Sequence, residues 1–151
     1  MAKLNSFTFL TLNGYFKGPG EDGFWPTAAA VQHFPKVAEG MNKAQKIVFS
    51  RKLRKAAWNN TSVISGDIVK QVRELKKKSR KPLTILGSGS IVRQLSEAGL
   101  IDTYQIMLDP VALGKGSTLF GGVKHDLTLK LENTRVFKNG SVLLTYTTAK
   151  K

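Results

Sequence analysis

The chain has 151 residues, which fits a single domain, residues 1–151, with a full hydrophobic core. Its 24 Lys and Arg against 10 Asp and Glu give a formal charge of +14, which favours anionic partners such as nucleic acid, acidic membranes or phosphorylated small molecules. It contains no cysteine, which excludes disulfides and thiol chemistry and suits the cytoplasm, and we expect neither a signal peptide nor a membrane partner because its apolar runs are short.

The first half of the sequence predicts strands that are separated by loops and short helices. Residues 3–12 alternate as a strand does, and Asn13-Gly14 ends it. Glycines within residues 18–23 predict a loop, residues 27–34 a short helix that Pro35 ends, and residues 36–41 a further turn. Strands are expected over 46–50 and 62–65, with a turn at 58–61.

Helices and strands alternate more regularly from Asp67 onward. Asp67 is a good N-cap, and Ile68, Val72 and Leu75 behind it form one apolar helical face. A strand over 83–86 and a helix over 91–100, with Gly99 as its C′ residue, follow. This alternation predicts a parallel α/β arrangement.

The last third of the chain predicts antiparallel strands. Residues 104–108 alternate, and so do residues 127–137. Asn139-Gly140 then separates the second of these runs from an apolar strand over 141–147, which is a strong hairpin signal. The architecture expected is therefore a parallel front half with an antiparallel C-terminal hairpin.

Basic residues concentrate in two runs, one over 46–55 and one over 70–81. For the second run we favour a solvated helix face, whose lysines offset the helix dipole, over a binding patch. No aromatic residue is interleaved with these lysines, which weakens the interpretation as a single-strand binding surface. A nucleic-acid partner is possible but is not favoured over a small-molecule substrate. The two histidines stand alone, without metal-ligand spacing, and we expect no metal site.

The segment Gly87-Ser88-Gly89-Ser90, between an apolar strand and an amphipathic helix, is the most informative motif. Such a turn directs free N–H groups and the positive end of a helix dipole at one point, which suits a phosphate of a nucleotide. Val92 stands where a dinucleotide fingerprint has its third glycine. A plain strand-to-helix turn remains the alternative.

Four stretches together resemble the dihydrofolate reductase-like fold, and most of all the C-terminal reductase domain of the riboflavin-biosynthesis deaminase–reductase and its stand-alone relatives. They are Leu12-Asn13-Gly14-Tyr15, Ile47 to Arg51, Leu86 to Val92, and Asp109 to Gly116 with Leu119-Phe120. The resemblance implies a mixed sheet with flanking helices.

The resemblance also implies an NADPH site. Ser50, Arg51 and Lys52 would hold the adenosine end, with a basic side chain on the 2′-phosphate. The turn Gly87, Ser88, Gly89 and Ser90, continuing to Ile91, would carry the pyrophosphate. Without the resemblance, Arg51 and Lys52 are interpreted as solvent-exposed residues that follow a strand.

Substrate would lie at the loop that follows the first strand. Asn13 and Gly14 stand where the family often has Asp-Gly, so acid chemistry from that side chain is not expected. Lys115 is the candidate for an anionic substrate group, or else an exposed loop lysine. No catalytic residue is assigned.

The chain departs from the family between Leu12 and Lys46. Family members are some tens of residues longer there and carry a Gly-Arg-x-Thr-Tyr-Glu-like turn that this sequence lacks around Asp22–Phe24. The fold is therefore predicted to be shortened after its first strand, and a second copy of the chain could pair with the edges left open.

The sequence therefore predicts an NADPH-dependent reductase acting on a small heterocyclic or pyrimidine-type, riboflavin-pathway-like substrate, and a homodimer. One alternative is a non-catalytic nucleotide-binding or dimeric structural module that retains the fold. Another is a basic nucleic-acid-binding protein.

Overall fold

A computed structural model describes residues 1–17 and 35–149. The chain divides into two compact units, the first made of Met1–Glu21 with Val69–Lys151 and the second of Asp22–Ile68. The region of the expected shortening, the loop over 18–23 and the helix expected over 27–34 lie outside the described residues.

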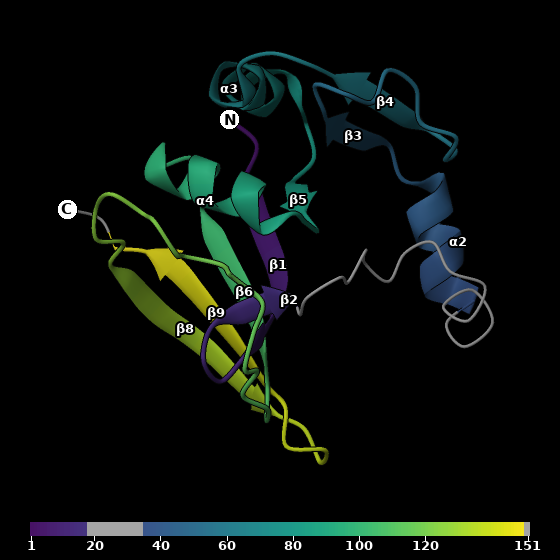
Figure 1. The fold of residues 1–151 in the computed structure, drawn as a ribbon. Helices are drawn as coiled ribbons and strands as arrows, with labels where there is room; N and C mark the ends of the chain where they lie inside the picture. The colour runs from purple at the N-terminus through teal and green to yellow at the C-terminus, as the bar shows by residue number, and fades with distance from the viewer. Residues whose placement is uncertain (18–34, 150–151) are drawn as a thin grey trace. The chain divides into compact units, whose positions relative to one another are not determined.

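A five-stranded mixed sheet forms the centre of the first unit, in the order β5-β1-β6-β9-β8 (Figure 1). Strand β1 (Leu4–Thr11) lies parallel to both β5 (Leu83–Ile85) and β6 (Thr103–Asp109). The strands β8 (Leu129–Val136) and β9 (Val142–Thr148) add the antiparallel C-terminal hairpin beside β6. The predicted combination of parallel and antiparallel strands is thus confirmed.

Helix α4 (Gly89–Glu97) packs on the sheet through an apolar side at helical spacing. Val92 and Leu95 are almost fully buried, and the buried hydroxyl of Tyr104 in β6 donates to Ser96 Oγ at 2.9 Å. The helix ends as the sequence predicted, with Gly99 at φ +65° and the Leu100 N–H bonded back to the Leu95 carbonyl. The core of the first unit lies between α4 and β1, β5 and β6.

Helix α3 (Ile68–Lys78) begins directly after Asp67, as expected, and buries Val72. It also buries Lys76, which sequence reasoning placed on a solvated face. Lys76 Nζ donates to Asp102 Oδ2 and to the Leu100 carbonyl, both at 2.7 Å. The expectation for this one lysine was wrong, because its carboxylate partner lies 26 residues away and leaves no local pattern.

A second, two-stranded antiparallel sheet in the first unit pairs β2 (Tyr15–Lys17) with β7 (Ser117–Thr118). Neither strand was expected, since runs of three and two residues carry too little periodicity to be recognised. This pairing brings the residues that follow β1 against the loop that follows β6.

The second unit contains α2 (Pro35–Lys43) and a parallel pair, β3 (Lys46–Phe49) and β4 (Thr61–Ile64). Pro35 opens α2, because proline fits the first helical turn, where its missing N–H leaves no bond unmade. Lys46 Nζ bonds the Met41 and Ala44 carbonyls at 2.7 Å each and so neutralises the C-terminal end of α2. None of the described helices is long and apolar enough to cross a membrane.

Candidate functional site

The glycine turn joins β5 to α4 as predicted and leaves the helix N-terminus open. Ser88 is the N-cap residue, with φ −86° and ψ 172°, but its side chain makes no capping bond. Its hydroxyl lies 2.7 Å from that of Ser90, and both side chains are exposed. The Ser88 side chain therefore does not cap the first turn of α4, and an uncapped helix N-terminus suits an anion.

The two glycines of this turn have different structural roles. Gly87 has φ +154° and open space where a Cβ would stand, so a ligand can approach its backbone. Gly89 is buried, and a Cβ there would collide with the ring of Phe16 in β2. Gly89 is thus required by packing, whereas Gly87 and Ser88 form the accessible part of the turn.

The contact between Phe16 and Gly89 places the candidate cofactor turn beside the loop that follows β1. That loop holds Asn13 and Gly14, the two residues predicted for substrate binding. Sequence reasoning did not find Phe16, because an aromatic residue in a short strand carries no sign of which glycine it covers. Within the first unit, the predicted cofactor turn and the predicted substrate loop are therefore neighbours.

Asn13 and Gly14 form a tight turn that hydrogen bonds hold to Thr11 on one side and to Leu113 on the other. The Asn13 amide donates to the Leu113 carbonyl at 2.7 Å and accepts from the Leu113 N–H and the Thr11 hydroxyl. Gly14 has φ +81°, and its N–H donates to the Thr11 carbonyl. Thr11, which the sequence did not single out, is buried, and its hydroxyl oxygen also accepts from the Tyr15 N–H.

The structure thus shows Asn13 as a bridge between the loops after β1 and β6. Lys115 lies in the second of these loops, exposed, and is followed by Gly116 at φ +154°. Both loops lie at the C-terminal ends of the parallel strands β1 and β6, the edge where α/β sheets commonly bind ligands. Substrate binding by Asn13, Gly14 and Lys115 stays a prediction.

The remaining cofactor candidates, Ser50, Arg51 and Lys52, follow β3 in the second unit. The Ser50 hydroxyl oxygen accepts from the N–H groups of Lys52 and Leu53, at 3.3 and 2.9 Å, and so shapes the turn. Arg51 and Lys52 are exposed, as are Arg54 and Lys55 beyond them. Their contribution to a cofactor site stays a prediction, since they belong to a different unit from the glycine turn.

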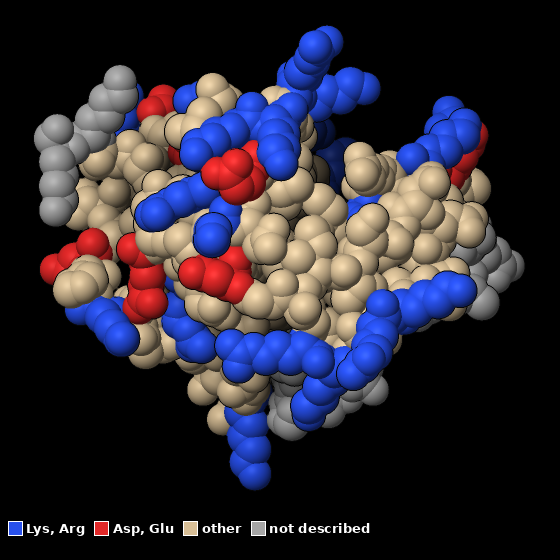
Figure 2. All heavy atoms as spheres, turned by 90° about the horizontal axis from the view of Figure 1, so that it is seen from above, with Lys and Arg blue, Asp and Glu red and all other residues tan. Residues whose placement is uncertain are grey.

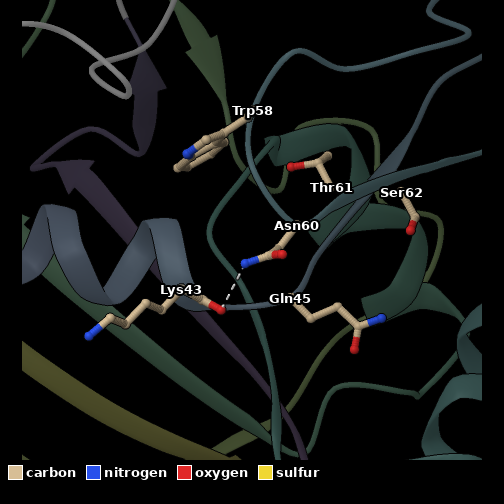
Figure 3. A pocket seen from close by; sticks show the side chains of 6 residues that line it. All are labelled: Lys43, Gln45, Trp58, Asn60, Thr61 and Ser62. Atoms are coloured by element: carbon tan, nitrogen blue, oxygen red, sulfur yellow. Dashed lines mark hydrogen bonds between the residues drawn. The ribbon is translucent and has the colours of Figure 1, made fainter.

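A polar pocket of about 540 Å³ opens in the second unit, at the starts of β3 and β4 (Figure 3). It is lined by Lys43, Gln45, Trp58, Asn60, Thr61 and Ser62, and the Lys43 side chain points away from it. The Asn60 amide donates to the Lys43 carbonyl, and Lys46 Nζ lies 4.7 Å from the centre of the Trp58 ring. None of the predicted site residues lines this pocket, because Ser50 to Lys52 follow the opposite end of β3.

No group of three His, Asp or Glu residues that could hold a metal ion occurs among the residues that the structure describes. His125 is exposed, and His33 lies outside the described residues.

The fold is that of the dihydrofolate reductases, as solved structures show. A putative riboflavin biosynthesis protein from Shewanella sp. PV-4 matches with a TM-score of 0.72 at 17% identity, over 99% of this chain and 100% of the other. Dihydrofolate reductase from Enterococcus faecalis matches with a TM-score of 0.64 at 15% identity, over 98% and 97%. The Thermotoga maritima diaminohydroxyphosphoribosylaminopyrimidine deaminase/5-amino-6-(5-phosphoribosylamino)uracil reductase matches with a TM-score of 0.64 at 14% identity, over 98% of this chain and 57% of that one.

The chain belongs to the RibD C-terminal domain family, whose model matches residues 22–143. It is also 34% identical over 106 residues to YyaP of Bacillus subtilis strain 168, an uncharacterized protein. That match covers 70% of this chain and 56% of the relative. The predicted fold and family are confirmed, and the family supports the predicted oxidoreductase class.

Proposed function

We propose that this protein is an NADPH-dependent reductase that transfers hydride to a small heterocyclic or pyrimidine-type substrate related to riboflavin-pathway intermediates. The observation that carries the proposal is the open N-terminus of α4 behind the accessible turn at Gly87 and Ser88. Membership of the RibD C-terminal domain family supports it. So do two structural relatives, one described as a uracil reductase and one as a dihydrofolate reductase complexed with NADP(H).

The proposal assigns groups in each unit to separate parts of the dinucleotide. The N–H groups at the start of α4 and the exposed Ser88 and Ser90 hydroxyls offer donors to a pyrophosphate. Arg51 offers a planar guanidinium to a 2′-phosphate, and Lys52 a second positive charge. When bound, NADPH would supply the hydride, and the protein would orient it and exclude water.

The loops after β1 and β6 would receive the substrate in this proposal. Asn13 fixes the two loops to each other, and Lys115 would pair with an anionic group such as a substrate phosphate. We assign the proton to a solvent water, because the amide of Asn13 has no acidic proton to give.

The test is a fluorescence titration of NADPH and NADH, comparing Arg51→Ala with Arg54→Ala. Both arginines are exposed in the loop after β3, so the two variants lose the same charge from the same segment. A hydrogen bond to a charged group contributes about 1.5–3 kcal/mol, so Arg51→Ala should weaken NADPH binding about tenfold or more and leave NADH binding unchanged. Arg54→Ala should leave the NADPH/NADH ratio as it is.

An unchanged ratio in Arg51→Ala would refute the phosphate assignment. Equal losses of NADPH affinity in the two variants would show that the change in net charge alone weakens binding. If the chain binds NADPH but oxidises it with none of the pyrimidine or pterin substrates offered, the non-catalytic nucleotide-binding module becomes the better description.

We also propose a homodimer. Among the described residues, β5 is an edge strand and β3 pairs only with β4, so both strands present backbone groups that a further strand could bond. Light scattering during size-exclusion chromatography should give about twice 16.6 kDa. A monomer across the concentrations used would refute the homodimer and leave the reductase proposal standing.

A further inference from the structure

The exposed side of α3, with the two basic residues that follow the helix, is the most strongly charged surface that the structure describes without an assigned role. Residues 68–81 hold seven Lys or Arg and one acidic residue. Lys76 is withdrawn into the core, and the other six basic side chains are exposed. We define this α3 surface as Lys70, Arg73, Lys77, Lys78, Arg80 and Lys81.

Helix geometry aligns these charges. At about 100° per residue, Lys70, Arg73 and Lys77 fall within about 60° of one another around α3, and their mean direction lies about 110° from that of the buried Val72 and Lys76. Figure 2, seen from above relative to Figure 1, shows more Lys and Arg side chains than Asp and Glu on the side of the molecule that it draws.

Within residues 68–81, acidic side chains neutralise little of this charge. Glu74 is the acidic residue within the run, and its carboxylate pairs with Lys77 Nζ at 2.9 Å, with both side chains about half exposed. The hydrogen bond and charge of Lys77, with smaller contributions from Lys78 and Lys70, lower the pKa of Glu74, so this carboxylate is ionised at neutral pH. One negative charge, that of Glu74, still faces the five positive charges of Arg73, Lys77, Lys78, Arg80 and Lys81.

The helix dipole explains only part of this arrangement. Lysines in the last turn offset the partial negative charge there, which accounts for Lys77 and Lys78. Arg73 lies farther from the C-terminal end of α3, and Arg80 and Lys81 lie beyond the helix, where the dipole effect has fallen off. The helix dipole therefore does not account for these three cations.

We infer that the α3 surface binds the phosphate backbone of nucleic acid without reading its sequence. From Lys70 to Lys78 the helix rises about 12 Å, a length of duplex that carries about seven phosphate charges. The surface offers cations and no aromatic side chain on which bases could stack, so contacts to phosphates in a duplex fit it best.

A membrane surface fits less well. Helices that lie in the lipid interface insert an apolar face, but Val72 of α3 is buried in the protein, and Ile68 and Leu75 are partly buried. The inference is independent of the reductase proposal, because none of the six side chains belongs to the candidate cofactor or substrate residues.

The experiment is fluorescence anisotropy of a labelled duplex of random sequence, titrated with the full chain at several salt concentrations. With four phosphates neutralised, the slope of log K against log salt should be about −3.6, so affinity should fall about 150-fold between 50 and 200 mM salt. The double variant Arg73→Gln/Lys78→Gln should reduce the slope to about −1.8 and that loss to about twelvefold.

The matched control is Lys130→Gln/Lys138→Gln, which removes the same charge from β8 and its hairpin loop. Strand β8 lies at the opposite edge of the five-stranded sheet from β5, so this control should keep the original slope. Equal weakening by the two double variants would overturn the inference, since net charge would then explain all binding. No binding at 50 mM salt, or tighter binding to phosphatidylserine vesicles than to the duplex, would also overturn it.

Discussion

The ion pair between Lys76 and Asp102 should be a main support of the first unit, and Asp102→Asn tests this. Lys76 Nζ lies 2.7 Å from Asp102 Oδ2, with the Lys76 side chain 8% exposed and that of Asp102 31%. The same oxygen accepts the Leu4 N–H at 2.8 Å. An asparagine could still accept from Leu4 but could not neutralise the buried ammonium group.

The magnitude follows from this geometry. Removing one partner of a fully buried ion pair costs about 3–5 kcal/mol. Water reaches part of the Asp102 carboxylate and takes up some of the lost interaction, so we expect Asp102→Asn to lower the free energy of unfolding by about 2–3 kcal/mol. That corresponds to a fall of about 1 M or more in the urea midpoint, followed by far-ultraviolet circular dichroism.

The pair also predicts a pH dependence. Burial alone would raise the pKa of Asp102, but the hydrogen bonds from Lys76 and the Leu4 N–H, with the charge of Lys76, lower it below its usual 3.8. A lowered pKa in the folded state stabilises the fold above the pKa of the unfolded chain, and this stabilisation is lost as pH falls through the folded pKa. The difference between wild type and Asp102→Asn should therefore be constant above about pH 5 and shrink below about pH 4.

The exposed pair of Lys77 and Glu74 supplies the control. Glu74→Gln removes a carboxylate at a similar distance from its lysine, 2.9 Å, but in solvent, and should leave the urea midpoint unchanged. If Asp102→Asn costs less than about 1 kcal/mol, or no more than Glu74→Gln, then the buried pair is not a main support of the first unit.

Two further predictions concern packing in the core and at the glycine turn. Gly89→Ala should destabilise the protein by about 1–3 kcal/mol, because the added methyl group meets the ring of Phe16. Gly40→Ala, at an open position in α2, should instead stabilise the protein by about 0.5–1 kcal/mol. Thermal unfolding of the two variants checks that the two changes have opposite signs. Tyr104→Phe should cost about 1–2 kcal/mol in urea unfolding, since the buried Ser96 hydroxyl loses its donor, and a cost near zero would contradict this. Burial raises the pKa of Tyr104, so its phenol should stay protonated above pH 10 in the folded chain, and stability should fall as pH rises further; an absorbance titration beside the Phe variant isolates this group.

Regular periodicity explains how much of the fold the sequence could predict. Strand β1, helix α4 and the strands of the C-terminal hairpin all show clear patterns and lie where expected, within a few residues. The hairpin itself differs in detail. The Phe137 N–H bonds the Ser141 carbonyl, and only Gly140 has positive φ, so the loop holds three residues instead of two.

Features that depend on distant partners could not be predicted. The burial of Lys76 depends on Asp102, and the role of Gly89 depends on Phe16, and in both cases the partner belongs to another element. In the candidate site, the spacing of the glycines predicted the turn after β5. It could not predict the hydrogen bonds between Asn13 and Leu113, because these two residues lie 100 positions apart. Local sequence patterns therefore predict elements with regular periodicity, but they do not predict contacts between residues far apart in the chain.

The interior position of β1 has a consequence for the order in which the protein can fold during synthesis. The strand is made before its hydrogen-bonding neighbours β5 and β6, and the Leu4 N–H bonds a carboxylate that lies 98 residues later in the chain. The ribosome must therefore release most of the polypeptide before the middle of the sheet can close. Such high contact order slows folding and keeps an apolar strand unpaired on the nascent chain, where chaperones that bind extended apolar segments would act.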